Sequence, residues 1–206
     1  PHAAAAGCTR VTLELGGKSP TIVFDDADLD AAVLTAMRAS FGHSGQMCTA
    51  GSRLLVQRSI LAEMTERMTA AVGRVPVGDG LDGGITVGPL VSEEQRERVL
   101  GYIRAGVDEG ATLLAGGGVR EPGFYVEPTL FAGVTNDMRI AREEIFGPVV
   151  GIIPFDDEAD SIRLANDTAY GLAAGVWTRR LRPAPLNGAA ADGGAAVRNN
   201  PNPVEP

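Results

Sequence analysis

The chain has 206 residues, of which 44% are apolar, 21% charged and 5% aromatic, and its formal net charge at pH 7 is −8. This length and composition predict a globular domain with a hydrophobic core of fair size. The negative charge argues against binding to nucleic acid or to an anionic membrane. No apolar run reaches the roughly 18 residues that a membrane-spanning helix needs.

Two cysteines are present, Cys8 and Cys48, and they lie 40 residues apart in unrelated contexts. This arrangement does not indicate a disulfide framework. No secretory signal opens the sequence, and residues 1–6 resemble the interior of a longer chain. We therefore expect a reducing, cytoplasmic environment.

The first half of the chain alternates short apolar runs, typical of buried strands, with segments of helical periodicity. Acidic residues precede the first helical segment and a serine precedes the second, and these residue types cap helix N-termini. The elements predicted here are strands at Arg10–Leu15, Thr21–Phe24 and Leu54–Gln57, and helices at Leu29–Phe41 and from Ser59 to Val72.

The second half repeats this pattern after a turn-rich loop at residues 75–88. Ser92 and Gln95 form a capping-box pattern at the start of a helix that runs to about Glu109. The other predicted elements are strands at Thr112–Ala115, Val149–Phe155 and Gly171–Thr178, an extended segment at Tyr125–Val134, and a helix from Asp156/Asp157 to Asn166.

Strands that alternate with helices of this length indicate βαβ units and a parallel sheet. The predicted fold class is therefore α/β, with a mostly parallel sheet flanked by helices on both faces in three layers, α/β/α. Residues 181–206 show no hydrophobic period and are rich in Pro, Gly, Ala and Asn. We expect this segment to be a disordered tail.

Cys48 stands out because it follows a predicted helix and lies among glycines and small hydroxyl residues. A thiol in such a loop is close to backbone N–H groups, which favour a thiolate and can bind a developing oxyanion. The same pattern also fits an inert cysteine in a loop, so chemistry alone leaves both readings open.

Three stretches together resemble the aldehyde dehydrogenase superfamily. They are the glycine segment Val11–Pro20 (VTLELGGKSP), the cysteine segment Gly45–Arg53 (GQMCTAGSR) and the glutamate segment Glu143–Val149 (EEIFGPV). The resemblance runs from about residue 3 to about residue 180. It implies the catalytic domain of that family, an enzyme that oxidises a small-molecule aldehyde to an acid with NAD or NADP.

The resemblance also implies roles for single residues. Cys48 matches the nucleophile, which passes through a thiohemiacetal and a thioester, and Glu14 matches the general base that activates water. Leu15 and Gly16 match positions near the nicotinamide. Glu144 and Phe146 match the residues that meet the nicotinamide ribose. No metal is implied.

Other polar residues near these segments have plainer readings. His43 is five residues from Cys48, a spacing that fits no pairing rule, and reads as a solvated loop residue. Lys18 is expected to make structural hydrogen bonds or salt bridges. Cys8 is expected to be a small buried apolar residue.

Family members are about twice as long as this chain or longer, and the resemblance therefore implies a partial enzyme. Residues 1–16 match the end of the cofactor-binding domain, residues 17–180 the catalytic domain, and residues 181–206 lie outside the family pattern. The family is homo-oligomeric, and its oligomerisation segment has no match here. Two alternatives stay open: an inactive truncated remnant, and a reactive-thiol module that works without cofactor.

Overall fold

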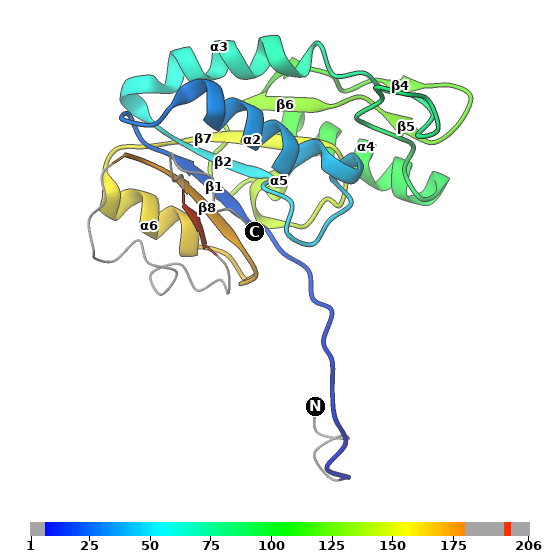
Figure 1. Ribbon diagram of the computed structural model, residues 1–206, viewed down its shortest axis with the longest axis horizontal. Helices are drawn as coiled ribbons and strands as arrows, with labels where there is room; N and C mark the ends of the chain where they lie inside the picture. Colours follow the sequence, from blue (N-terminus) through cyan, green and yellow to red (C-terminus); the bar gives the residue numbers. More distant parts are fainter. Residues whose placement is uncertain (1–6, 180–195, 199–206) are drawn as a thin grey trace.

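The computed structural model describes residues 7–179 and 196–198. Their main feature is one sheet in the strand order β3-β6-β7-β2-β1-β8-β9 (Figure 1). All neighbouring strands pair in parallel except β3 with β6. The strands are β1 Pro20–Val23, β2 Arg53–Gln57, β3 Thr112–Ala115, β6 Thr129–Ala132, β7 Val149–Phe155, β8 Ala174–Trp177 and β9 Ala196–Arg198.

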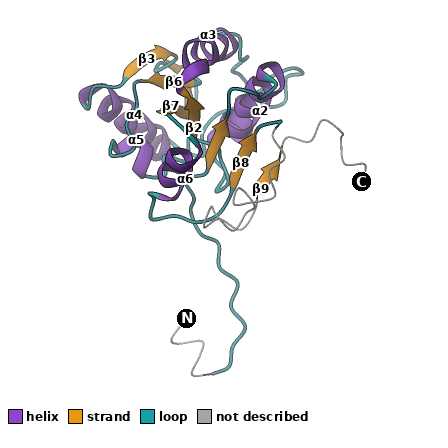
Figure 2. Cartoon of the chain, turned by 90° about the vertical axis from the view of Figure 1, so that its left-hand side faces the viewer, coloured by secondary structure: helices purple, strands orange, loops and turns teal. Residues whose placement is uncertain are grey.

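Helices cover both faces of this sheet (Figures 1 and 2). On one face lie α2 (Leu29–Phe41) and α3 (Leu61–Val72), and on the other α4 (Glu93–Asp108), α5 (Arg139–Arg142) and α6 (Glu158–Asn166). The short helices η1 (Gly42–Gly45) and η2 (Arg58–Ile60), and the hairpin of β4 (Val119–Arg120) with β5 (Tyr125–Val126), complete the described elements. No helix of residues 7–179 is long and apolar enough to cross a membrane.

The core consists of two hydrophobic clusters, one on each face of the sheet. Strands β2 and β7 contribute to both clusters because their alternate side chains point to opposite faces. Residues 54–56 of β2 and the whole of β7 are therefore apolar, as expected for parallel strands buried on two sides. The predicted three-layer α/β/α fold with a mostly parallel sheet is confirmed.

Side-chain caps fix the starts of three helices. The carboxylate of Asp28 accepts a hydrogen bond from the Ala31 N–H at 3.1 Å, and the Asp157 carboxylate accepts one from the Asp160 N–H at 2.9 Å. At the start of α4, Ser92 Oγ accepts from the Gln95 N–H at 3.2 Å. The predicted cap of α3 is wrong, because Ser59 lies inside η2 and α3 begins after Ile60 without a side-chain cap.

Two other expectations about elements differ from the structure. Arg10–Leu15 is exposed and belongs to no strand, because no other described segment pairs with it; residues 7–15 lead away from the folded body (Figures 1 and 2). Within the expected tail 181–206, Ala196–Arg198 form β9, which pairs in parallel with the free edge of β8. The rest of that tail, residues 181–195 and 199–206, lies outside the described residues.

Candidate active site

The cysteine segment begins with a sharp reversal of the chain after α2. His43, Ser44 and Gly45 have φ values of 50°, 59° and 69°, all in the left-handed region. Such backbone is easily adopted by glycine and is uncommon for other residues. A Cβ atom at Gly45 would collide with the carbonyl oxygen of Gly147, so the cysteine and glutamate segments are in contact at this point.

Cys48 lies three residues after this reversal, in a turn where the Ala50 N–H donates to the Met47 carbonyl at 3.1 Å. Its side chain is half-buried and its thiol is free. The Gly51 N–H donates to the Ala39 carbonyl of α2 at 3.0 Å, which ties the turn to the helix. Partial exposure in a loop held on both sides is the setting that a reactive thiol needs.

Gly17 joins all three segments. A Cβ atom at Gly17 would collide with the carbonyl oxygen of Cys48, and its N–H donates to Glu144 Oε1 at 3.1 Å. A Cβ atom at the preceding Gly16 would collide with the Glu144 carboxylate. The absence of side chains at these two positions therefore lets Cys48 and Glu144 approach the same stretch of backbone.

The glutamate segment is held by side chains from α4. Gln95 Nε2 donates to the carbonyl oxygens of Ile145 at 3.1 Å and Phe146 at 2.8 Å. Arg98 Nη2 donates to the Glu144 carbonyl at 3.0 Å. Phe146 has a φ of 57° and is 38% exposed, so its ring is available to a ligand, while Glu144 is half-buried.

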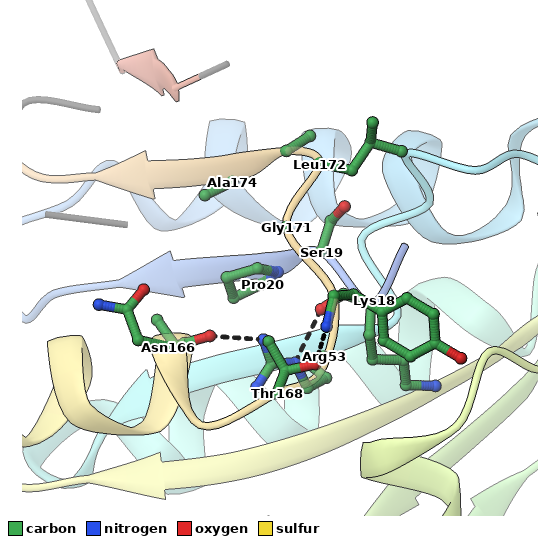
Figure 3. A pocket seen from close by; sticks show the side chains of 12 residues that line it. Lys18, Ser19, Pro20, Arg53, Asn166, Thr168, Gly171, Leu172 and Ala174 are labelled. Carbon is green, nitrogen blue, oxygen red and sulfur yellow. Dashed lines mark hydrogen bonds between the residues drawn. The ribbon is translucent and has the colours of Figure 1, made fainter. Parts of the chain in front are cut away.

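Arg53, at the end of the cysteine segment, is fully buried and connects three parts of the fold (Figure 3). Its guanidinium donates to the carbonyls of Lys18 at 2.9 Å, Leu164 at 2.8 Å and Ala165 at 2.7 Å, and to Asn136 Oδ1 at 3.2 Å. The last turn of α6 leaves such carbonyls without helical partners, and a cation there satisfies them. Burial lowers the pKa of Arg53 to about 10, so it stays charged at neutral pH.

Lys18 is the sole lysine of the chain and is 2% exposed. Its Nζ has no hydrogen-bond partner within the described residues, so the expectation of a hydrogen-bonded or ion-paired lysine is wrong. Burial, and secondarily the charge of Arg53, lower its pKa to about 7, although Glu144 and Glu143 oppose this. Near neutral pH the site therefore contains an amine that is only partly protonated.

A cavity of about 50 Å³ lies beside these two side chains, between the start of β1 and the loop that precedes β8 (Figure 3). Ser19 also lines it, and its buried hydroxyl likewise has no hydrogen-bond partner among the residues described. A cavity of this size has room for water beside polar groups. Water at this point would satisfy the hydroxyl.

The remaining predicted site residues lie on the exposed extended segment. Glu14 and Leu15 directly precede the glycine pair, and Leu15 is 63% exposed. Both residues are neighbours of Gly16 in the sequence, but no described hydrogen bond or ion pair joins Glu14 to the cysteine or glutamate segment. Cys8, expected to be buried, is exposed, because it lies farther along the same segment.

Sequence reasoning missed the supporting residues of the site. Gln95 was interpreted only as part of a capping box, and its backbone N–H does bind Ser92, but its side chain reaches the glutamate segment. Arg53 was part of the cysteine segment without a role. Contacts across 50 or 111 positions leave no periodic signal in a sequence, and only the place of a charged residue, Arg53, directly before an apolar run hints at one. Among the described residues, no group of three His, Cys, Asp or Glu side chains is placed to hold a metal ion.

Comparison with known proteins extends this description. Residues 2–206 match the aldehyde dehydrogenase family, a range that takes in the segment 181–206 set apart in the sequence analysis. A betaine aldehyde dehydrogenase of Rhizobium etli is 53% identical over 184 residues, which cover 87% of this chain and 38% of that protein.

Solved structures give the same assignment. The NAD+ complex of an aldehyde dehydrogenase from Bacillus cereus superimposes with a TM-score of 0.91 and 43% identity, over 98% of this chain and 41% of that one. An indole-3-acetaldehyde dehydrogenase in complex with NAD+ gives a TM-score of 0.90 and 48% identity, over 95% and 40%. The chain thus spans about two fifths of the length of these relatives, and it belongs to the aldehyde dehydrogenase family.

Proposed function

We propose that this chain is the catalytic portion of an NAD- or NADP-dependent aldehyde dehydrogenase, which oxidises an aldehyde to a carboxylic acid. The observation that supports it best is the convergence of the three segments at Gly17, which touches the Cys48 carbonyl and binds Glu144. In this proposal residues 17–180 form the catalytic domain, residues 1–16 end the cofactor-binding domain, and residues 181–206 form a separate tail, although the family match extends over them.

Cys48 is the proposed nucleophile. Its thiolate attacks the aldehyde carbonyl carbon, a C–S bond forms, and the resulting oxyanion accepts a hydrogen bond from the Cys48 backbone N–H. Loss of hydride from this thiohemiacetal leaves a thioester on Cys48. Its half-buried position in a loop supports this role, because the thiol is free and reachable.

Glu14 is the proposed general base. It takes a proton from water, whose oxygen attacks the thioester carbon; the C–S bond breaks, the acid leaves and the Cys48 thiolate is restored. Support comes from its place two residues before Gly16 on an exposed, extended segment, where a carboxylate has access to water.

The nicotinamide end of the cofactor fits the residues present. A bound nicotinamide dinucleotide supplies the acceptor for the hydride. In this proposal the backbone of Leu15 and Gly16 lies near the nicotinamide. The Glu144 carboxylate, which fills the space beside Gly16, binds a ribose hydroxyl, and Phe146 presents a half-exposed ring. Residues 78–83 (GDGLDG) match the pattern G-x-G-x-x-G, but they lie in a loop that neither follows a strand of the sheet nor opens a helix, as a dinucleotide-binding motif would. The proposal therefore assigns only the nicotinamide end of the cofactor to the chain.

The proposed substrate is a small-molecule aldehyde, and betaine aldehyde is the first to test, because relatives carry that name. We assign no nucleic-acid or membrane partner, in keeping with the net charge of −8. The proposed location is cytoplasmic. The resemblance implies a homo-oligomer, and the proposal assigns none of the 206 residues to the segment that joins its subunits.

The nucleophile can be tested without cofactor by an activated ester, such as a nitrophenyl ester. Attack by Cys48 would release nitrophenol and leave an acyl group on the chain, which intact mass spectrometry detects. We expect acylation at Cys48 that is lost in Cys48→Ala and kept in Cys8→Ser, which removes the other, exposed thiol. Equal acylation of the two cysteines would contradict the assignment.

The complete reaction is tested with betaine aldehyde and NAD or NADP, by the absorbance of the reduced cofactor. Cofactor reduction that disappears in Cys48→Ala supports the proposal. Glu14→Gln is expected to slow release of the acyl group by a factor of about 10² to 10⁴, the usual contribution of a general base. An acyl group that leaves Glu14→Gln at the original rate would exclude Glu14 as the base.

A further inference from the structure

We propose that Gln95 and Arg98 of α4 are positioning residues of this site. By binding three consecutive carbonyl groups of the glutamate segment, they hold the Glu144 carboxylate against Gly17 and present Glu144 and Phe146 together. The inference rests on the proposed function in one respect, that Glu144 and Phe146 contact the cofactor ribose.

The geometry is that of a two-residue clamp. Gln95 Nε2 lies 3.1 Å from the carbonyl oxygen of Ile145 and 2.8 Å from that of Phe146, and Arg98 Nη2 lies 3.0 Å from that of Glu144. Gln95 and Arg98 are three positions apart, so they project from the same side of the helix. One turn of α4 therefore binds the backbone at 144–146.

The segment needs such support because it has no regular structure of its own. Residues 143–146 belong to no helix or strand. Phe146 adopts a φ of 57°, which is unfavourable for a residue with a side chain. Carbonyl groups that a helix or sheet would satisfy are bound here by side chains, and this binding keeps the left-handed turn at Phe146 in place.

The two clamp residues are themselves fixed. The Gln95 N–H donates to the Ser92 cap at 3.2 Å. The Arg98 guanidinium lies 5.7 Å from the centre of the Tyr102 ring, and the Tyr102 hydroxyl donates to Glu143 Oε2 at 2.8 Å. Gln95 and Arg98 therefore project from a capped helix, and Tyr102, which lies beside Arg98, binds Glu143, the residue before Glu144.

Movement of the backbone at residues 144–146 would weaken the hydrogen bond between the Gly17 N–H and the Glu144 carboxylate. Its N–H donates to Glu144 Oε1 at 3.1 Å, and the space beside Gly16 is already filled by the same carboxylate. If Arg98 no longer bound the Glu144 carbonyl, the Glu144 side chain would move away from the Gly17 N–H. The exposure of the Gly17 amide to solvent exchange thus reports the position of Glu144 without any cofactor or turnover.

The test is amide hydrogen exchange, followed by NMR in the whole chain, in Gln95→Glu. A carboxylate has the size of the amide but donates no hydrogen bond, and Glu is favoured at this third helical position, so α4 is retained. We expect exchange at Gly17 to be roughly tenfold faster, as for the loss of one hydrogen bond, with unchanged exchange at Ile152 in β7. The control is Glu94→Gln on the exposed side of the same turn.

Arg98 supplies a second and independent variant. Arg98→Ala removes the donor to the Glu144 carbonyl, whereas Arg98→Lys keeps a donor on a long side chain. We expect faster exchange at Gly17 in Arg98→Ala and substantial recovery in Arg98→Lys, with no effect of Arg104→Ala, which changes an exposed arginine on the same helix. A general loss of stability in Arg98→Ala would accelerate exchange at Ile152 as well as at Gly17.

Two results would overturn the inference: Gly17 exchange in Gln95→Glu equal to that in Glu94→Gln, or acceleration spread equally over Gly17 and Ile152. The cofactor is tested separately, by titration of the unaltered chain with NAD. A chain that binds no NAD counts against the proposed function, while the exchange at Gly17 still decides whether α4 positions Glu144.

Discussion

Glycines bring the three family segments together, because each leaves space that a neighbouring backbone or carboxylate fills. Gly17 faces the Cys48 carbonyl, Gly16 faces Glu144, and Gly45 faces the Gly147 carbonyl. Only Gly45 also needs a left-handed conformation, at a φ of 69°. The geometry of the site thus depends on missing side chains as much as on the thiol and carboxylate themselves.

At the same scale, Lys18 makes the stability of the fold depend on pH. Its pKa falls from about 10.5 in the unfolded chain to about 7 in the fold, chiefly through burial. Between these pH values the unfolded chain binds more protons at this amine, so stability rises with pH. The slope for one proton is at most about 1.4 kcal/mol per pH unit.

We therefore expect the free energy of unfolding in urea to rise from pH 7 to pH 9 more steeply in the original chain than in Lys18→Met. Below pH 7 Lys18→Met is expected to be the more stable, because it buries no charge. Since the chain has one lysine, NMR of isotope-labelled lysine also reads its titration directly. A titration near the ordinary value of a solvated lysine, or parallel pH profiles, would refute this account.

At the scale of elements, Arg53 fastens β2 to the end of α6 and to the glycine segment. Arg53→Met would leave three buried carbonyls without a donor, and each such group costs about 1 to 3 kcal/mol. We expect the free energy of unfolding to fall by about 3 kcal/mol or more. Urea denaturation followed by circular dichroism measures it.

The matched control is Arg58→Met, which removes an arginine from an exposed pair with Asp156. Surface pairs of this kind contribute little, so its unfolding midpoint should stay close to that of the original chain. If both arginine variants unfold at the same urea concentration, the buried contacts of Arg53 are not a major source of stability.

Local signals predicted most of these elements. Leu29–Phe41 and Val149–Phe155 were predicted at their observed bounds, because a capping aspartate and a continuous apolar run are local features. Arg10–Leu15 has the same alternation as a strand but no partner, and pairing is not encoded within a segment. Four-residue α5 is too short to show a period. In the same way, the candidate nucleophile was readable from its neighbours, and the side-chain contacts of Gln95 were not.

At the scale of the whole molecule, β2 and β7 belong to both hydrophobic clusters, so the two layers of helices share one sheet. We expect one cooperative unfolding transition. The fluorescence of Trp177, which packs on the α2–α3 side, and far-ultraviolet circular dichroism should give the same midpoint.

Variants on opposite faces sharpen this expectation. Met68→Ala in α3 and Ile103→Ala in α4 each remove a buried side chain, at a cost of about 2 to 5 kcal/mol. In each variant, the unfolding midpoints measured by Trp177 fluorescence and by circular dichroism should fall by the same amount. A shift of Trp177 fluorescence alone in Met68→Ala would mean that the two layers unfold separately.

The reach of Arg53 also sets an order of events during synthesis. Its hydrogen bonds to Leu164 and Ala165 span 111 and 112 positions, and contacts of such separation form late because long loops must close first. A growing chain that has already made Cys48 has therefore not yet made the α6 carbonyl groups that Arg53 binds. The thiol is therefore made early on the ribosome, and the buried support of the cysteine segment by Arg53 is complete only after α6 emerges.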